Sequence, residues 1–181
     1  MSEAGGVAGY VRGSTVINSV ADCLVTSNCG KGSAGGIVGL VEYNSSILNC
    51  YSSGTLVAAQ TTARLGGIAG TGTEVTIENC ISSAVLSGDT AVKGGIIGNS
   101  DGSRINLKNC GWLTVTADKA YGSGNPDREE DVQALTRINN CVTSFTGVSP
   151  FISADRNAEG AFQIFRTWPG SGQNAVSSMV Y

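Results

Sequence analysis

The sequence predicts an all-β protein, a right-handed parallel β-helix of about four to five coils with a short helical capping insertion. Composition is the first observation behind this prediction. The chain of 181 residues contains 26 Gly and only 14% charged residues, so it is poor in helix formers and rich in turn residues. The other two observations are a Gly-Gly motif that occurs four times and an Asn-Cys motif that follows each copy. Because these linked motifs recur about every thirty residues, each period is interpreted as one coil.

The first motif, G-G-[VI]-[AVI]-G, marks the beginning of each coil. It starts at Gly5, Gly35, Gly66 and Gly94, so the starts are separated by 30, 31 and 28 residues. The residues after Gly-Gly are short, apolar and β-branched, which is typical of a strand. The glycines either supply a positive φ at a corner or let two backbones approach closely. The structural glycines of the repeat are predicted to be Gly35, Gly36, Gly39, Gly66, Gly67, Gly70, Gly94, Gly95 and Gly98.

The second motif is an aliphatic residue, any residue, Asn or Asp, and then Cys. It occurs at 20–23, with Asp22 in place of Asn, and at 47–50, 77–80 and 107–110; a fifth copy at 138–141 lacks a Gly-Gly partner. Asn tolerates left-handed backbone and therefore predicts a bend that turns both the aliphatic residue and the Cys toward the core. Third strands are expected at 55–57 and 85–86. The predicted ladder residues are Asn49, Cys50, Asn79, Cys80, Asn109, Cys110, Asn140 and Cys141.

The pattern changes after the fourth coil. Residues 118–137 are predicted to form a capping insertion with a short helix, because Asn125 suits an N-cap, Pro126 suits the first helical position, and acidic residues follow. Such a helix would cover open strand edges. Residues 145–181 hold six of the eleven aromatic residues. We therefore expect a solenoid domain over 1–144 and a C-terminal cap, or the start of a following β module, over 145–181.

These motifs resemble the GLUG-motif repeats of bacterial surface and adhesin-like proteins, which also occur in the N-terminal regions of IgA-specific metallopeptidases. The resemblance rests on G-G-I-V-G-L at 35–40, G-G-I-A-G at 66–70 and G-G-I-I-G at 94–98, each followed by its Asn-Cys motif. It covers roughly residues 5–141. It implies a β-solenoid in an extracellular or cell-surface bacterial protein, and it transfers no catalytic residue.

Little in the sequence indicates chemistry. Six cysteines leave three alternatives open: buried thiols, one disulfide between Cys23 and Cys29, or a metal site, although no C-x-x-C occurs. The absence of His removes the commonest general base. The carboxylates are scattered singly apart from a cluster at 127–131, which we interpret as a solvated helix start. We therefore expect no catalytic residue, no metal and no cofactor, and a chain that is not an enzyme.

The predicted function is a non-catalytic structural or adhesive module of a larger bacterial cell-surface or secreted protein. The expected partners are a host or matrix protein or a glycan, besides adjacent domains of the parent chain. A net charge of −3 predicts no nucleic-acid partner, and no apolar run is long enough for membrane insertion. Two alternatives remain: a carbohydrate-binding or carbohydrate-active β-helix, and a module that stacks end to end. Candidate ligand contacts are Tyr43, Tyr51 and Trp112, with partial burial as the alternative for each.

Overall fold

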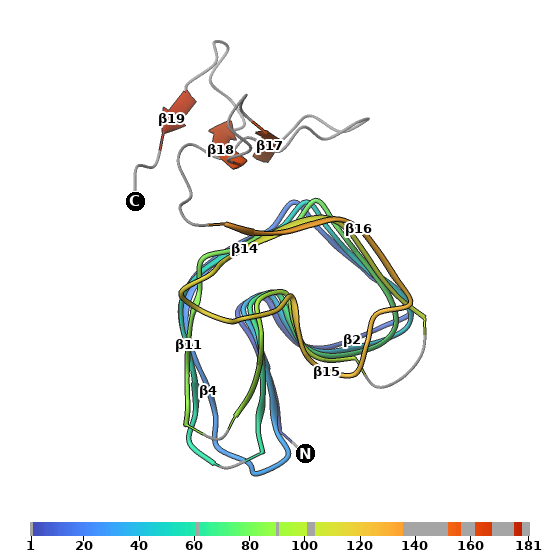
Figure 1. The fold of residues 1–181 in the computed structure, drawn as a ribbon, viewed down its shortest axis with the longest axis vertical. Helices are drawn as coiled ribbons and strands as arrows, with labels where there is room; N and C mark the ends of the chain where they lie inside the picture. The colour runs from blue at the N-terminus through green and yellow to red at the C-terminus, as the bar shows by residue number, and fades with distance from the viewer. Residues whose placement is uncertain are drawn as a thin grey trace.

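The computed structural model describes residues 2–60, 62–89, 91–100 and 104–135, together with the backbone of three later strands. Up to residue 135 the described chain winds into a β-solenoid of about four turns (Figure 1). The predicted all-β solenoid is confirmed. No helix in the described part of the chain is long and apolar enough to cross a membrane.

Each coil contributes its strands in the same order. The first coil contains β1 (Glu3–Gly5), β2 (Ala8–Arg12), β3 (Thr15–Ile17) and β4 (Val20–Ser27). The second contains β5 (Ser33–Gly35), β6 (Val38–Leu48) and β7 (Tyr51–Ala58). The third contains β8 (Arg64–Gly66), β9 (Ala69–Glu78), β10 (Ile81–Ser82) and β11 (Val85–Ser87). The fourth contains β12 (Val92–Gly94), β13 (Ile97–Ser100) and β14 (Ile105–Leu113), and a shortened fifth contains β15 (Tyr121–Ser123) and β16 (Arg128–Leu135).

The paired strands of these coils are parallel, so equivalent residues of successive coils stack in ladders. Strands β1, β5, β8 and β12 form one sheet, and the remaining solenoid strands form a second sheet. In the second sheet, for example, Ile47 lies beside Ile77, which lies beside Leu107. Neighbouring rungs of such a sheet are about 4.8 Å apart. The environment of each side chain is therefore set mainly by the equivalent residues in the coils before and after it.

The core consists of two clusters of buried aliphatic side chains. The larger cluster fills the main body and includes the ladder of Ile37, Ile68 and Ile96. The smaller cluster fills a lobe, the part of each coil between the β1–β5–β8–β12 sheet and strands β4, β7 and β11, which points downward in Figure 1. Its buried members are Val25, Ala34, Leu56, Leu65, Ala84 and Leu86.

The Gly-Gly pairs join the lobe to the main body, and close approach explains them. A Cβ on Gly35 would overlap the carbonyl oxygen of Val38, and one on Gly36 would lie 2.5 Å from the Cβ of Ser52. The positive-φ glycines of the described chain are Gly13, Gly54, Gly88 and Gly124, none of which belongs to a Gly-Gly pair. Of the two alternatives left open by the sequence, the structure therefore favours backbone approach over positive φ.

Asparagine forms one sharp corner of each coil, as the sequence predicts. Asn49, Asn79 and Asn109 have φ values of 57°, 54° and 48°, in the left-handed region that Asn tolerates. Strand β6 ends at Leu48 before this bend, and β7 begins at Tyr51 after it. We call this feature the Asn corner. It comprises Asn18, Asn49, Asn79, Asn109 and Asp131.

The assignment of Asp22 and Cys23 to the corner of the first coil was wrong. Asn18 takes that place, with a φ of 53° and a hydrogen bond from the Asn49 side chain. Val20 lies beside Tyr51, which puts Ser19 where later coils have Cys, while Asp22 lies further along the strand beside Ser53. The distance in sequence from the Gly-Gly pair identifies Asn18 as the corner residue. Asn18 follows Gly5 by 13 residues, as Asn79 follows Gly66, whereas Asp22 follows Gly5 by 17.

The helical capping insertion predicted over 118–137 was also wrong. Strand β15 lies beside β13, and β16 lies beside β14, so these residues form a fifth rung. Asp131, with a φ of 60°, makes the Asn-type bend, and Val132 lies beside Cys110. Parallel pairing in register along β14 replaces the local helix signal of Asn125 and Pro126, which lie between β15 and β16. The motif at 138–141, with Asn140 and Cys141, lies outside the described residues.

Three later strands pair differently from the solenoid. Strands β17 (Ile152–Arg156), β18 (Phe162–Thr167) and β19 (Val176–Ser178) form a sheet whose pairs are antiparallel. The change from parallel to antiparallel pairing accompanies the change in composition seen in the sequence. The division at residue 144 lies outside the described residues and stays a prediction.

Candidate functional site

The four Asn side chains of the Asn corner form hydrogen bonds with one another. The amide nitrogen of Asn79 donates to the side-chain oxygen of Asn49 at 3.0 Å, and that of Asn109 donates to the oxygen of Asn79 at 2.6 Å. Asn49 donates in the same direction to Asn18, at 3.3 Å. Each amide therefore links its coil to the preceding one, and the half-buried ladder offers little to a ligand.

The cysteines next to this corner are buried thiols. The sulfurs of Cys50, Cys80 and Cys110 each lie 3.2 Å from the carbonyl oxygen of the residue two positions earlier. Burial raises the pKa of the Cys80 thiol well above its ordinary value, which disfavours the reactive thiolate. Cys23 and Cys29 are also free thiols, so the disulfide that the sequence left open between them is not formed in the structure.

Of the three aromatic residues predicted as candidate ligand contacts, two are buried. Tyr51 is 4% exposed and its hydroxyl hydrogen-bonds to Ser83 at 2.6 Å, and Trp112 is 6% exposed. The Trp112 indole packs against Gly95 and donates to the carbonyl of Ala117 at 2.8 Å. Neither ring presents a face to a ligand in this structure. Tyr43, at 52% exposed, does.

Tyr43 belongs to an exposed group that we call the corner cluster, formed by Tyr10, Arg12, Glu42 and Tyr43. The Tyr10 hydroxyl donates to the Glu42 carboxylate at 2.9 Å, and this bond raises the pKa of the Tyr10 phenol. The Arg12 guanidinium lies 3.9 Å from the centroid of the Tyr43 ring, a cation–π contact. The cluster therefore combines two tyrosine rings with one positive and one negative group on the surface of the first two coils.

Strand pairing brings the corner cluster together. Arg12 on β2 lies beside Glu42 on β6, and Tyr10 lies beside Leu40 on the same pair of strands. The register then shifts between Glu42 and Ser45, where Tyr43 adopts a φ of 58°. Sequence analysis missed Tyr10, Arg12 and Glu42. The sequence does contain a signal for this cluster. Tyr10 and Arg12 are two positions apart on one strand, so they face the same side, and Glu42 lies one coil later in register with Arg12.

A second corner of the coil begins beside the cluster. We call it the variable corner, because its left-handed residues differ from coil to coil: Gly13, Asn44, Glu74 and Arg104, with φ values of 55°, 55°, 55° and 57°. A hollow of about 300 Å³ lies here. It is lined by Asn44, Ser45, Glu74, Val75, Thr76, Arg104, Asn106 and Asp127. Carboxylate, guanidinium, amide and hydroxyl groups together can both donate to and accept from a ligand rich in hydroxyls.

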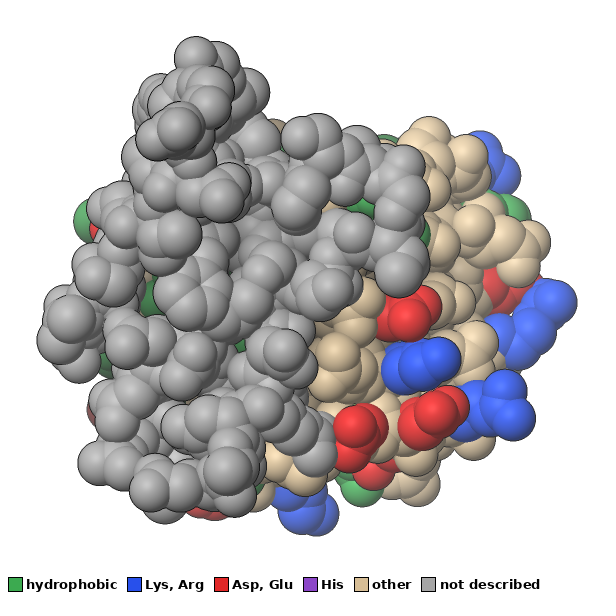
Figure 2. Space-filling view, turned by 90° about the horizontal axis from the view of Figure 1, so that it is seen from above, with side chains coloured by type: hydrophobic (Ala, Val, Ile, Leu, Met, Phe, Trp, Pro, Cys, Tyr) green, Lys and Arg blue, Asp and Glu red, His purple; other side chains and the backbone are tan. Residues whose placement is uncertain are grey.

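Opposite charges are interspersed around this hollow rather than gathered by sign. Arg104 forms an ion pair with Glu74 one coil earlier, and Lys108 lies 3.8 Å from Glu78 across the same pair of strands. Figure 2 shows acidic and basic side chains interspersed on the part of this face that is not grey. Such a surface suits directional polar contacts better than attraction of a uniformly charged partner.

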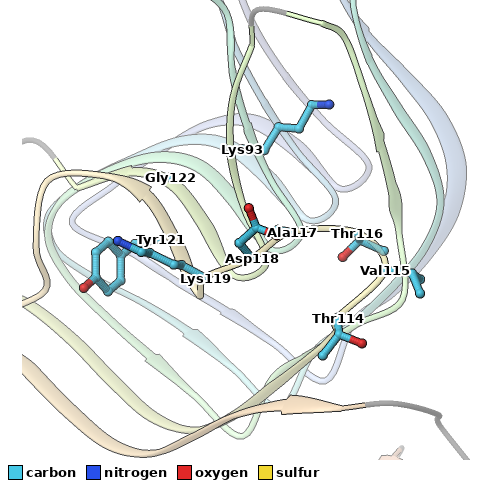
Figure 3. A pocket seen from close by; sticks show the side chains of 9 residues that line it. All are labelled: Lys93, Thr114, Val115, Thr116, Ala117, Asp118, Lys119, Tyr121 and Gly122. Carbon is cyan, nitrogen blue, oxygen red and sulfur yellow. The ribbon is translucent and has the colours of Figure 1, made fainter.

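A larger hollow, about 440 Å³, lies at the end of the solenoid (Figure 3). It exists because the chain turns back after β14 and crosses to β15 instead of following the lobe for another coil. It is lined by Lys93, Thr114, Val115, Thr116, Ala117, Asp118, Lys119, Tyr121 and Gly122. The Trp112 indole holds the crossing segment through the Ala117 carbonyl. The hollow is thus a consequence of how the coil stack ends.

Comparison with known families agrees with this architecture. Residues 30–57 match the family model described as the GLUG motif. This stretch of the chain therefore carries one GLUG motif. The matched residues contain the Gly-Gly pair at Gly35, strands β5 and β6, the corner at Asn49 and all of β7 except its last residue. The GLUG pattern therefore corresponds to one coil, which the neighbouring coils repeat. Searches of the curated proteins and of the solved structures found no significant match.

Proposed function

We propose that this GLUG region is a non-catalytic structural and adhesive module of a larger bacterial cell-surface or secreted protein. One observation carries the proposal: the side chains that recur from coil to coil are used to hold coils together. The Asn side chains bond to one another, the Cys thiols face backbone carbonyls, and the glycines fit against neighbouring backbone. The location outside the cell rests on the resemblance to surface-protein repeats.

The corner cluster and the neighbouring hollow are the proposed contact surface. Tyr10 and Tyr43 are both about half exposed, and each ring carries a hydroxyl group. Aromatic rings beside carboxylate and guanidinium groups can stack on the apolar face of a sugar and bond to its hydroxyls, or can contact a protein surface. The position also favours recognition, since side chains of the variable corner are free to differ between coils.

A glycan-binding module is the second candidate, and the hollow at the variable corner supports it. Its lining combines one basic group, two acidic groups, two amides and two hydroxyls within about 300 Å³. A glycan ligand would make the module a carbohydrate-binding one with the same surface. Catalysis would require turnover in addition to binding.

Binding to an arrayed panel of glycans and matrix proteins tests the proposal. We expect at least one ligand whose affinity falls at least tenfold in Tyr43→Ala and is unchanged in Leu24→Ala. Leu24 is the matched control because it is 70% exposed on β4, away from the corner cluster. A ligand retained by both variants would place adhesion elsewhere. Turnover of any polysaccharide would refute the non-catalytic assignment.

A further inference from the structure

The crossing from β14 to β15 creates a hollow that shares no lining residue with the hollow at the variable corner. Strand β14 ends at Leu113, where Thr116 closes a turn by donating its N–H to the Leu113 carbonyl at 3.0 Å. The chain then reaches β15 without entering the lobe (Figure 3). We call this space of about 440 Å³ the crossing hollow; it is lined by Lys93, residues 114–119, Tyr121 and Gly122. Its volume lies within the range of small-ligand sites, about 300–1,000 Å³.

Lys93 brings a positive charge to a ladder that is apolar in the preceding coils. It lies beside Leu65, which lies beside Ala34, and both of these residues are fully buried in the lobe core. Lys93 is half-buried, and Figure 3 shows its side chain reaching across the lobe beside the crossing segment. Its ammonium group forms no ion pair or hydrogen bond with another described residue. A half-buried ammonium group without a partner in the protein is stabilised by a negatively charged ligand.

The crossing segment adds further hydrogen-bond donors to the hollow. The backbone N–H groups of Ala117, Asp118 and Lys119 have no acceptor within the described part of the chain. The exposed Lys119 supplies a second ammonium group, 6.0 Å from the centroid of the Tyr121 ring. Ammonium and peptide N–H groups are the donors that the oxygens of a carboxylate or a sulfate accept. The crossing hollow therefore favours an anionic group, although the whole chain has a net charge of −3.

Three other side chains restrict which anion fits. Asp118 lines the hollow but forms no ion pair with a lysine of the described chain, so its carboxylate can accept from a ligand hydroxyl and repels a second negative group. Thr114 is exposed, and its hydroxyl can donate or accept. The half-buried Tyr121 offers the face of an aromatic ring. These groups together suit a ligand with one negative group, several hydroxyls and an apolar ring face, which are the properties of a sugar acid.

We propose that the crossing hollow binds a uronic acid unit of an acidic glycan. Lys93 and the free N–H groups of the crossing segment bind the carboxylate, and Asp118 accepts from a sugar hydroxyl. Figure 3 shows Asp118 between Lys93 and Tyr121, so a neighbouring neutral sugar of the same glycan packs against the Tyr121 ring. This site goes beyond the proposed function, because the contact surface proposed above shares no residue with the crossing hollow.

The test measures binding to the full chain by isothermal titration calorimetry. The probes are disaccharides of glucuronate or galacturonate joined to a neutral hexose. Each is compared with the neutral disaccharide in which a CH₂OH group replaces the carboxylate, and inorganic sulfate is the third probe. The variants are Lys93→Gln, Lys93→Arg and Lys119→Gln. The matched control is Lys31→Gln, which removes one exposed positive charge from the link between β4 and β5, and circular dichroism checks that each variant is folded.

We expect an acidic disaccharide to bind about tenfold more tightly than its neutral counterpart, and Lys93→Gln to remove about the same factor, because a charge-assisted hydrogen bond is lost in both cases. Lys93→Arg should retain binding, Lys119→Gln should weaken it, and Lys31→Gln should leave it unchanged. Tyr43→Ala should also leave it unchanged, which separates this site from the contact surface proposed above.

Three results would overturn the proposal. The first is that none of the acidic probes binds, or that each binds no better than its neutral counterpart. The second is a loss in Lys31→Gln equal to that in Lys93→Gln, which would reflect the overall charge of the chain instead of a site. The third is sulfate binding as tight as that of the disaccharides, which would make the crossing hollow a site for a bare anion. If Lys93→Gln does not fold, unchanged binding in the exposed Lys119→Gln variant would overturn it as well.

Discussion

The solenoid turns through left-handed backbone at two corners of each coil, and the two corners use different chemistry. The Asn corner repeats Asn in the first four coils, and these half-buried side chains bond from coil to coil. At the variable corner the corresponding residues are Gly13, Asn44, Glu74 and Arg104. Backbone geometry is the same at both corners, so geometry alone does not select Asn. The hydrogen-bonded ladder of side chains selects Asn. At the variable corner no such ladder of one residue type exists, so charged residues and residues that contact a ligand can occupy it.

The Asn corner should show the largest effect of substitution. In Asn79→Leu the ladder loses a donor to Asn49 and an acceptor for Asn109, and a branched residue is forced into positive φ. Two hydrogen bonds at about 0.5–1.5 kcal/mol each and about 1–2 kcal/mol for left-handed backbone give a loss of about 2–5 kcal/mol in the free energy of unfolding. Urea unfolding followed by circular dichroism measures it.

Asn79→Gly separates the two causes, because glycine adopts positive φ readily but cannot join the ladder. We expect it to lose about 1–2 kcal/mol, mainly from the hydrogen bonds. A value for Asn79→Gly close to that of wild type would mean that the ladder contributes nothing. Asn would then be selected for its backbone preference alone.

The variable corner should respond less to the same pair of changes. Glu74→Leu keeps the strained φ of 55° and removes a surface ion pair with Arg104, which is worth about 0–1 kcal/mol. In Glu74→Gly, relief of the left-handed backbone offsets that loss, so we expect stability within about 0.5 kcal/mol of wild type. Urea titrations of both variants test this. A loss at Glu74→Gly as large as that at Asn79→Gly would remove the distinction between the corners.

The repeat explains how much of this structure the sequence could predict. Gly36 and Asn49 were identified because several copies of each local signal were superimposed at one period. Where only one copy existed, local reasoning failed. The Asp22-Cys23 pair matched the motif better than Asn18, which forms the corner, and Asn125 with Pro126 indicated a helix next to residues that form strand β16 by pairing with β14. A motif that recurs reports on tertiary structure, whereas a single motif reports only local preference.

The corner cluster shows the complementary limit. Tyr10 and Glu42 are separated by 32 residues, one coil and two positions, and neither recurs in the other coils. Their contact depends on the register between strands β2 and β6, which is set by the positions of the Gly-Gly pairs and the Asn corner in the structure. Residues that occur in only one coil distinguish this module from other copies of the repeat, and a search for recurring positions does not find them. Candidate contacts chosen for being aromatic therefore included Tyr51 and Trp112, which the fold buries.

The smallest expected effect concerns the ionisation of Tyr10 beside the variable corner. Its hydroxyl donates to the Glu42 carboxylate, so loss of the proton breaks the bond and brings two negative charges together, and the pKa of the phenol is raised above 10.0. Since the folded pKa is the higher one, the bond stabilises the fold below the pKa of the unfolded phenol and is lost as pH rises through the folded pKa. Subtracting the tyrosinate titration of Tyr10→Phe from that of wild type isolates this group. Glu42→Gln should move the isolated curve to lower pH. A curve that stays in place would show that Glu42 does not hold the proton, and that the side chains of this corner, unlike those of the Asn ladder, act independently of one another.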